Sequence, residues 1–500
     1  MKARRILPVL FASTFLTLLL ACGGGKNKPK ELTLLLHMLP NQEIYFRNDV
    51  LNTFEKLNNC KINIVQFNQW WDIETMLKLQ KEKNDPNIFL VKVPFEMSRV
   101  LVGNGLMEPL DNIVSPEVLE RDMAEYQSLA LGLGYVDNKP YYVPRKLETR
   151  LLFYLKSKVE DALKNWQQYE NELNQLLKPQ NGYGLPKNYS LESDPAQWDY
   201  YDIFVMGYYW AHQKYFNTNV FMPRIAHRAD RYEGTALGLV DQAIQLGATP
   251  EDVMRMDAEP VVDMFNWEAV YIKNNIYNSD MWNESWRGTH LYEAVKEGKV
   301  FMTVFQQIDC FIVHGWEDNP EMPGYLKDPS DMAVTTMPKA VSFELNRDGT
   351  YKKEGTKKIS TGGWWWGIPK TSPDKELAYR LARFITNRDN QAVECSKFGM
   401  LPVRKDIVNN LSETFELGWV GDIFKVSIEQ LDINGYSTVP LLQEYSDISR
   451  NYIEAWYALC VDKYAKSDDK KVDFAGLRQT LKSKYVGIEK NILKDKYPAK

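Results

Sequence analysis

The chain has 500 residues, with 61 Lys and Arg against 66 Asp and Glu and a formal net charge of −5. This balance gives no basic field that would gather phosphates, and no basic stripe is interleaved with aromatic residues, so we expect no nucleic-acid partner. The length allows two or three lobes of about 100 to 200 residues. Aromatic residues make up 13% of the chain, including 14 Trp and 28 Tyr. Flat rings with a polar edge suit sugar ligands, and the alternative is an aromatic-rich core.

The N-terminal segment reads as a targeting signal. Residues 1–21 have a basic start followed by an apolar run, which is typical of a secretory signal peptide. The letters LLAC, ending at Cys22, resemble a bacterial lipobox, in which the cysteine is acylated and becomes the new N-terminus. Residues 22–30 then predict a flexible, lipid-anchored linker. The alternatives are an ordinary signal peptide with a chance cysteine, or an uncleaved anchor helix.

The rest of the chain contains no apolar run of the ~18 residues needed to span a bilayer. We therefore expect an extracytoplasmic body that is held at a bacterial membrane by the lipid on Cys22, in the periplasm or at the cell surface. The remaining cysteines are widely spaced and form no C-x-x-C pair, so one or two disulfides and buried free thiols are both open alternatives. They are Cys60, Cys310, Cys395 and Cys460.

Strands and helices alternate at the start of the body. Residues 31–36, 61–67 and 87–93 read as buried or alternating strands, and the segments after them, among them 72–83 and 97–111, have helical spacing of apolar residues. This order predicts a parallel α/β lobe.

A second lobe is expected from the next part of the chain. Residues 156–300 are mainly helical and aromatic in pattern, and short strands follow within 298–308 and 331–340. A charged loop at 342–359 leads into the stretch STGGWWWGIPK at 360–370. Beyond it, Ser372 is a candidate cap for a helix with one buried stripe, and the chain from 420 to 500 is expected to be mostly helical.

Catalytic signatures are scarce. The sequence has no Walker loop, no H-E-x-x-H, no G-x-S-x-G and no Cys/His cluster at metal spacing, so we expect no cofactor and no metal. The 5 His residues are scattered and are expected to be structural or surface residues. With 66 acidic residues, some carboxylate pair will lie at glycosidase separation by chance, so the sequence does not exclude a hydrolase. The absence of a motif favours binding over catalysis.

Three stretches resemble the landmarks of one family in order. They are EGKVFMTVFQQ at 297–307, ISTGGWWWGIPKTSPDKELAYRLARFITN at 359–387 and GMLPVRKDI at 399–407. Together they resemble the extracytoplasmic solute-binding lipoproteins of carbohydrate ABC transporters, the maltose-binding-like family. The resemblance is weak between about residues 156 and 295.

This resemblance implies an α/β, periplasmic-binding-protein type II fold, with two lobes and a ligand cleft at a hinge. The N-terminal lobe would comprise 31–144 plus 361–387, and the C-terminal lobe 145–360 plus 388–500. The crossing segments would fall near Pro144, Ser360 and Asn387. Closure would be a hinge motion, and a membrane permease would recognise the closed form.

The resemblance also implies ligand contacts in the first lobe. Asn41 and Gln42 follow the first strand, where relatives hold polar sugar contacts; the alternative is a solvated loop. Gln69, Trp70 and Trp71 would face the cleft mouth, and one of the two adjacent indoles is expected on the ligand because both are hard to bury together.

Two carboxylates and a cation near the first crossing are further candidates by resemblance. Glu96 lies where relatives often have an Asp that accepts sugar hydroxyls, and Glu148 matches a family carboxylate. A carboxylate accepts bidentate hydrogen bonds from neighbouring hydroxyls, and the alternative for each is a hinge salt bridge. Arg145 is a cationic option for an acidic ligand.

In the second lobe, Trp198 and Tyr201 are the stacking candidates, with a packed helix as the alternative. Gln306 and Gln307 replace the family's Gly and the residue after it, and Ile308 stands where Trp is usual. Gln307 and Tyr445 are nevertheless expected to contact the ligand. The candidates to replace the missing stacking Trp are Trp282, Trp286 and Trp316.

The three adjacent indoles are expected to have different roles. In a strand, Trp364 and Trp366 share one face and Trp365 takes the other. We expect Trp365 to be core and Trp366 to shield the hinge. Trp364 would reach the cleft beside the backbone amides of Gly362 and Gly363, which allow close approach by a ligand.

The sequence therefore predicts a monomeric, lipid-anchored binding protein, and no enzyme, that captures a carbohydrate, expected to be an oligosaccharide, and delivers it to the permease subunits of an ABC importer. The alternatives are a secreted glycan-processing enzyme and a ligand-sensing surface lipoprotein.

Overall fold

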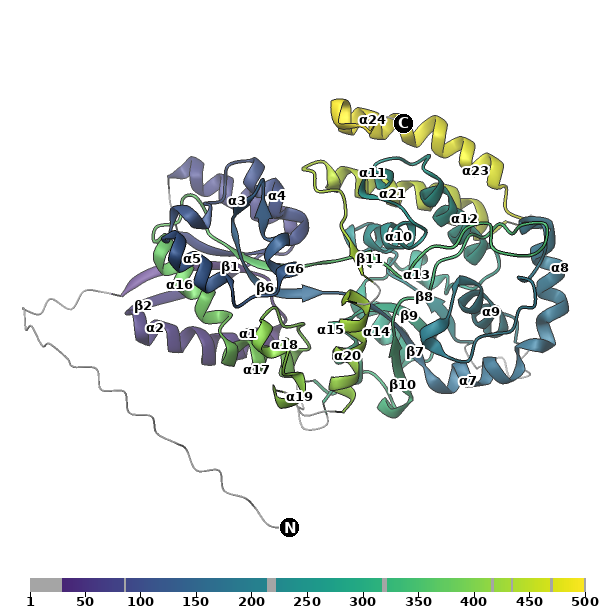
Figure 1. Ribbon diagram of the computed structural model, residues 1–500, viewed down its shortest axis with the longest axis horizontal. Helices are drawn as coiled ribbons and strands as arrows, with labels where there is room; N and C mark the ends of the chain where they lie inside the picture. The colour runs from purple at the N-terminus through teal and green to yellow at the C-terminus, as the bar shows by residue number, and fades with distance from the viewer. Residues whose placement is uncertain are drawn as a thin grey trace, which may run out of the picture.

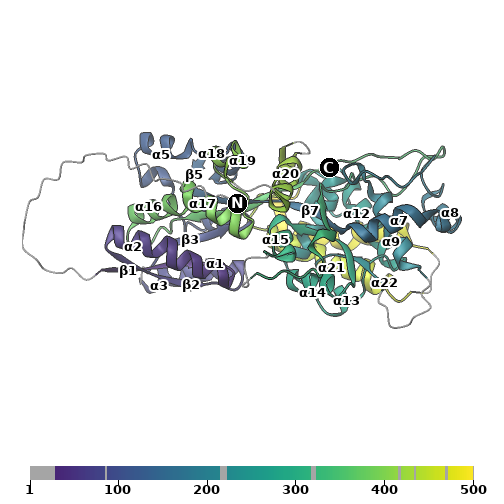
Figure 2. The ribbon, with the colours of Figure 1, turned by 90° about the horizontal axis from the view of Figure 1, so that it is seen from below.

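The computed structural model describes residues 29–84, 87–213, 222–316, 322–414, 418–432, 435–467 and 471–498. Two α/β lobes lie side by side along the long axis of the molecule, with crossing segments between them (Figure 1). Seen from below, the two lobes again lie side by side (Figure 2). The predicted α/β class with two lobes is confirmed. The signal peptide and Cys22 lie outside the described residues.

The first lobe, which we call the N-lobe, is built on a five-stranded sheet. Its strands β1, β2 and β3 are parallel, and β12 is antiparallel to both β3 and β6. Every residue of β3 is buried, and so are Leu32 and residues 34–36 of β1, because helices cover both faces of the sheet. The strand order is β2 (Cys60–Gln66), β1 (Lys30–Leu36), β3 (Ile88–Pro94), β12 (Gly362–Gly367) and β6 (Tyr142–Glu148).

Helices from two distant parts of the chain cover this sheet. The late helix α16 is capped by Asp374, whose side chain accepts from Leu377 N, and not by Ser372, whose hydroxyl donates to Phe89 O. Figure 1 shows α16 and α17 in green among the purple and blue helices of the early chain. The N-lobe elements are α1 (Pro40–Tyr45), η1 (Phe46–Leu51), α2 (Asn52–Asn58), α3 (Trp70–Lys83), α4 (Phe95–Gly103), η2 (Leu110–Asn112), α5 (Pro116–Met123), α6 (Ser128–Leu133), the small pair β4 (Tyr135–Val136) and β5 (Lys139–Pro140), α16 (Lys375–Ile385), α17 (Arg388–Phe398) and α18 (Lys405–Val408).

The second lobe, the C-lobe, has a four-stranded mixed sheet. Its order is β10 (Met332–Thr335), β7 (Arg150–Leu155), β9 (Val300–Gln306) and β8 (Arg224–Ala226). Strand β7 is antiparallel to both β10 and β9, whereas β8 and β9 are parallel.

Helices surround the C-lobe sheet, and their core is rich in aromatic rings. Trp267 packs edge-on against both Tyr200 and Tyr201, and its indole donates to Val341 O. The C-lobe helices are α7 (Lys156–Asn165), η3 (Trp166–Tyr169), α8 (Glu170–Asn181), η4 (Pro195–Gln197), α9 (Tyr200–Ala211), α10 (Glu233–Gln245), α11 (Pro250–Val253), α12 (Glu259–Lys273), α13 (Asp280–Asn283), α14 (Gly288–Lys296), α15 (Gln307–His314), η5 (Pro329–Asp331), α20 (Trp419–Asp432), α21 (Tyr445–Trp456), η6 (Tyr457–Val461), α22 (Asp462–Tyr464), α23 (Phe474–Thr480), η7 (Leu481–Tyr485), α24 (Val486–Leu493) and η8 (Lys494–Lys496).

The first crossing falls at Thr149, between β6 and β7, and not near Pro144. Pro144 is paired with Trp365 inside the N-lobe sheet, so the lobe boundary drawn there was too early. Thr149 is held by Gln307: Gln307 N donates to Thr149 O (3.1 Å), and Thr149 N donates to Gln307 Oε1 (3.0 Å).

The second crossing joins β11 (Ile359–Ser360) to β12. Ser360 is tied to the C-lobe, because its N–H donates to Asp241 Oδ1 (2.8 Å) and its carbonyl accepts from Arg150 (2.7 Å). Strand β11 pairs with β13 (Tyr436–Ser437).

The third crossing lies further along the chain than Asn387. Helix α17 packs against α16 and α18, and Gln391 in α17 donates to Arg145 O (3.1 Å), which ties the helix to the N-lobe sheet. Helix α20 instead packs against β7 and β10. Helix α19 (Leu411–Thr414) still contacts α18, so the N-lobe part of the chain extends past Asn387, and residues 388–408 do not belong to the C-lobe.

The four cysteines in the described part of the chain are free and buried: Cys60, Cys310, Cys395 and Cys460. The sequence left disulfides and buried free thiols as alternatives, and the structure shows free thiols at these four positions. Across the described ranges, no helix combines the length and hydrophobicity required to cross a membrane.

Candidate ligand-binding cleft

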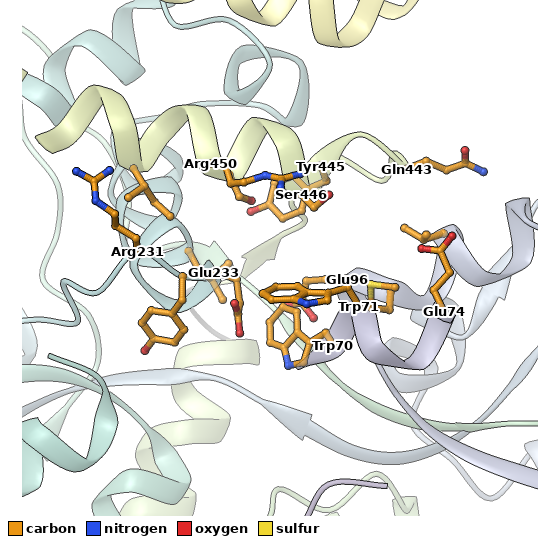
Figure 3. A pocket seen from close by; sticks show the side chains of 16 residues that line it. Trp70, Trp71, Glu74, Glu96, Arg231, Glu233, Gln443, Tyr445, Ser446 and Arg450 are labelled. Carbon is orange, nitrogen blue, oxygen red and sulfur yellow. The ribbon is translucent and has the colours of Figure 1, made fainter. Parts of the chain in front are cut away.

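A cavity of about 350 Å³ lies between the two lobes. Helices α3 and α4 of the N-lobe form one wall, and the start of α10 together with α21 of the C-lobe form the other (Figure 3). Its lining residues are Trp70, Trp71, Glu74, Glu96, Met97 and Val100 on the N-lobe, and Arg231, Tyr232, Glu233, Leu237, Gln443, Tyr445, Ser446, Ser449, Arg450 and Ile453 on the C-lobe.

Two adjacent indoles at the start of α3 project into this cavity (Figure 3). The helix start is fixed by Asp72, whose Oδ2 accepts from Gln69 N (2.8 Å). Successive side chains of a helix diverge by about 100°. Trp70 therefore packs partly on the N-lobe core, while Trp71 is 53% exposed. Gln69 serves as the residue before the helix and is not among the lining residues.

Two carboxylates face the cavity from opposite lobes, each in the first turn of a helix. Glu96 belongs to α4 and Glu233 to α10 (Figure 3). Burial, reinforced by the negative charges of Glu148 and Glu233, raises the pKa of Glu96 to about 7, although Arg150 opposes the shift. Burial also raises the pKa of Glu233.

A pH dependence of stability follows from Glu96. Its pKa is higher in the folded protein than the ordinary 4.5, so the folded state binds the proton more tightly and this carboxyl favours folding below that range. As pH rises from about 4.5 through about 7, its contribution falls. We expect Glu96→Gln to flatten part of the decline in melting temperature across this range. An unchanged pH profile in the variant would contradict the assignment.

The remaining charged lining residues have partners of their own. Glu74 pairs with Lys78 (2.5 Å) and accepts from Asn104 Nδ2 (2.8 Å). Arg231 pairs with Glu454 and lies over the Tyr457 ring (4.1 Å). Arg450 pairs with Asp447. These pairs lie at the exposed rim of the cavity.

Glu148 and Trp364 lie beside the cleft but do not line the cavity. Trp364 is 9% exposed, stacks on Phe67 (6.4 Å between ring centroids) and donates its indole N–H to Glu148 Oε1 (2.9 Å). Glu148 also pairs with Lys146 (2.5 Å). Burial alone would raise the pKa of Glu148, but Lys146, Lys92 and the Trp364 N–H lower it overall. Of the two roles considered for Glu148, a salt bridge and a ligand contact, the structure therefore supports the salt bridge.

The other two indoles of the triplet are core residues, and the expected division of faces holds. Trp366 stacks on Phe46 (6.2 Å), on the face that Trp364 shares, whereas Trp365 packs against Phe95 (5.8 Å) on the other face. Trp366 is fully buried inside the N-lobe and does not shield the hinge.

The two glycines before the triplet have different surroundings. A Cβ on Gly363 would come within 2.2 Å of Lys146 O, so strand pairing, and not approach by a ligand, requires this glycine. A Cβ on Gly362 would lie at ordinary distances from Phe95 and Glu96. Gly362 therefore adjoins the Glu96 end of the cleft.

Several predicted contacts are engaged inside the N-lobe. Arg145 is fully buried and pairs with Glu394 (2.7 Å), so it does not reach a ligand. Gln42 is buried, and its amide nitrogen contacts Glu394 (3.5 Å) and Met400. Asn41 lies beside it in α1 and is not among the residues that line the cavity.

The predicted contacts of the second lobe are also core residues, with one exception. Trp198 is fully buried and donates to Glu192 O (2.8 Å), and the Tyr201 hydroxyl donates to Phe343 O (2.6 Å). Gln307 is buried at the first crossing, where it holds Thr149. These three predictions were wrong because the residues satisfy internal partners. Tyr445 does line the cavity.

Most of the C-lobe wall was missed from sequence. Tyr232 and Glu233 open α10, and Ser446, Ser449 and Arg450 come from α21, more than 200 residues later. A glutamate at the start of a predicted helix was the one available signal, and it is a common capping feature in any helix. In the described ranges, no group of three or more His, Cys, Asp or Glu side chains is placed to hold a metal ion.

The fold and the cleft together define a two-lobed binding protein with its cavity between the lobes. The model of the bacterial extracellular solute-binding protein family matches residues 49–416. The chain therefore belongs to this family. A search of curated proteins gave no match.

Solved structures share the fold at low sequence identity. The maltose-bound MalE3 of T. maritima is 14% identical, with 90% of this chain and 99% of that chain covered and a TM-score of 0.63. A substrate-binding protein of Listeria monocytogenes in complex with cycloalternan is 15% identical, with 93% and 99% covered and a TM-score of 0.64. A solute-binding protein of Thermotoga lettingae, bound with alpha-D-tagatose, is 15% identical, with 92% and 100% covered and a TM-score of 0.63.

Proposed function

We propose that this protein captures a carbohydrate, expected to be an oligosaccharide, in the cavity between its lobes and delivers it to an ABC importer. The observation that carries the proposal is the inter-lobe cavity, in which the indoles of Trp70 and Trp71 face polar side chains of the opposite lobe. Family membership and the sugars named for the three similar structures support it.

The chemistry of the walls suits a sugar. A pyranose ring has an apolar face that stacks on an indole, a contact worth about 0.5 to 1.5 kcal/mol beyond area burial. Its hydroxyls donate to carboxylates and to hydroxyl groups, which Glu96, Glu233 and Ser446 supply across the cleft. Ligand contacts to both lobes would favour the closed state over the open one.

The family and the leader sequence support a proposed cellular setting. The protein acts outside the cytoplasm as a monomer, anchored by a lipid on Cys22, and its closed form is read by the permease subunits. No bond of the ligand is broken. Secreted glycan processing and ligand sensing are the competing functions.

A ligand screen tests the proposal. Thermal shifts of the purified protein, without its leader, are measured with sugars, polyols and peptides, and hits are confirmed by calorimetry. A ligand at 100 times its Kd stabilises the fold by about 2.7 kcal/mol. Binding of sugars without product release supports the proposal. Product release would favour the enzyme, and peptide hits with no sugar hit would overturn the proposal.

Replacing Trp71 with alanine should weaken sugar binding by roughly tenfold, which corresponds to about 1.4 kcal/mol. The melting temperature without ligand should change little, because this indole is largely exposed. Calorimetric titration of the variant with a hit from the screen measures the effect. Leu79→Ala, an exposed apolar residue on the same helix, is the matched control. Equal affinities for the Trp71 variant and the parent would place the ligand elsewhere.

A further inference from the structure

Two of the charged side chains that line the cavity are carboxylates without an ion-pair partner in the described part of the chain. Five charged residues line it, and the pairs described above engage Glu74, Arg231 and Arg450. Glu96 and Glu233 have no ion pair within the described part of the chain. Glu233 Oε2 is buried and has no hydrogen-bond partner there.

The cations nearest these two carboxylates are committed elsewhere. Arg150 pairs with Asp241 (2.9 Å) and donates to Ser360 O. Lys146 pairs with Glu148, and Arg287 pairs with Asp230 (2.5 Å). The other groups that face Glu96 are Glu148 from β6 and Tyr445 from α21, and neither supplies positive charge.

Two partly buried carboxylates on opposite lobes are unfavourable without a cation between them. Each loses water, and each raises the other's energy when both are ionised. A ligand that supplies a positive charge at this place removes both costs and links the lobes. The two indoles beside Glu96 add a surface that attracts a cation or a sugar ring.

We propose that the captured carbohydrate carries a protonated amine, which is held between Glu96 and Glu233 while its ring lies on Trp71. This inference rests on the proposed function and narrows it to amino sugars. The same two carboxylates disfavour acidic sugars as ligands. A linear polyamine shares the ammonium group but lacks the pyranose ring.

The test compares ligands that differ at a single substituent. Oligosaccharides with β-1,4 linkages and built from glucose, glucosamine or N-acetylglucosamine are titrated by calorimetry, together with the galactose and galactosamine pair, glucuronic acid and spermidine. We expect the free amine to bind at least tenfold more tightly than its neutral counterpart. Neutral or acidic sugars that bind as tightly as the amines would overturn the inference.

Variants locate the amine. Glu96→Gln and Glu233→Gln should each weaken binding of the amino sugar by roughly 10- to 100-fold, as expected for a hydrogen bond to a charged group. Binding of neutral sugars should weaken much less, because the glutamine amide oxygen still accepts a hydrogen bond from a sugar hydroxyl, so the preference for the amine is lost. Glu120→Gln, an exposed residue of α5, is the control for net charge. An unchanged preference in both cleft variants would overturn the inference.

The proton balance gives an independent readout. An ammonium beside Glu96 favours its ionised form, so below about pH 7, where the ligand amine keeps its proton, binding should release a proton and affinity should rise with pH. Titrations in two buffers with different ionisation enthalpies measure this release. Proton uptake on binding would contradict the inference.

The outcomes separate the two proposals. Sugar binding that requires Trp71 but shows no preference for amines overturns the inference and leaves the proposed function in place. Binding of spermidine with no sugar hit overturns the proposed function, and the amino-sugar inference with it. The same holds when no carbohydrate binds.

Discussion

Replacing Trp364 with alanine is expected to lower the free energy of unfolding by about 3–5 kcal/mol, the usual range for truncating a buried tryptophan. The indole is almost fully buried, stacks on Phe67, lies under the Lys92 ammonium (4.3 Å) and donates to Glu148. Its loss would leave a cavity and remove a hydrogen bond from a charged group. Urea denaturation followed by circular dichroism measures the change.

The comparison with Trp71 decides between packing and binding. Trp71→Ala should unfold at nearly the same urea concentration as the parent but lose ligand affinity. If Trp364→Ala is instead stable and loses only ligand affinity, the indole is a cleft residue and our placement of the cavity at α3 and α21 is wrong.

Replacing Glu394 with glutamine should also cost about 3–5 kcal/mol of stability, because Arg145 would remain buried with its charge unpaired. The two side chains are 2% and 0% exposed and are joined at 2.7 Å. The Arg145 guanidinium also lies over Trp366 (5.4 Å), where water does not reach it. Thermal and urea unfolding both measure the effect.

The exposed pair of Glu160 and Lys164 provides the control. Its side chains are 65% and 73% exposed and 4.0 Å apart, so Glu160→Gln should change stability by less than about 0.5 kcal/mol. Similar losses in the two variants would show that the Arg145 pair is solvated and is not a buried anchor of α17.

Local patterns predicted the architecture well. The alternation of strands and helices in residues 31–111 identified the parallel core of the N-lobe, because apolar periodicity there is set by a sheet covered on both faces. The family resemblance, and not the local pattern, pointed to Trp70, Trp71 and Glu96 as cleft residues, and all three line the cavity. Trp365 as a core residue also followed from simple alternation.

Partners far apart in sequence could not be predicted in this way. Arg145 read as a free cation because Glu394 is 249 residues away. Trp198 and Tyr201 read as stacking platforms because nothing in their own segment shows that they receive neighbours from both sides. Glu233 was not predicted because it matters for the opposite reason: no cation pairs with it in the described residues, and a sequence does not show the absence of a partner. The third crossing was predicted too early, at the helix boundary near Asn387. The residues around that boundary do not show on which lobe the next helix packs.

The exposure of Trp71 also makes the protein its own optical sensor. The chain has 14 tryptophans, and within the described residues Trp71 is the only one among the large exposed apolar side chains. A water-soluble quencher collides with this ring far more often than with indoles sealed in the lobes. The emission that the quencher removes therefore comes mainly from Trp71, and its protection by a ligand would report occupancy of the cleft in real time without a label.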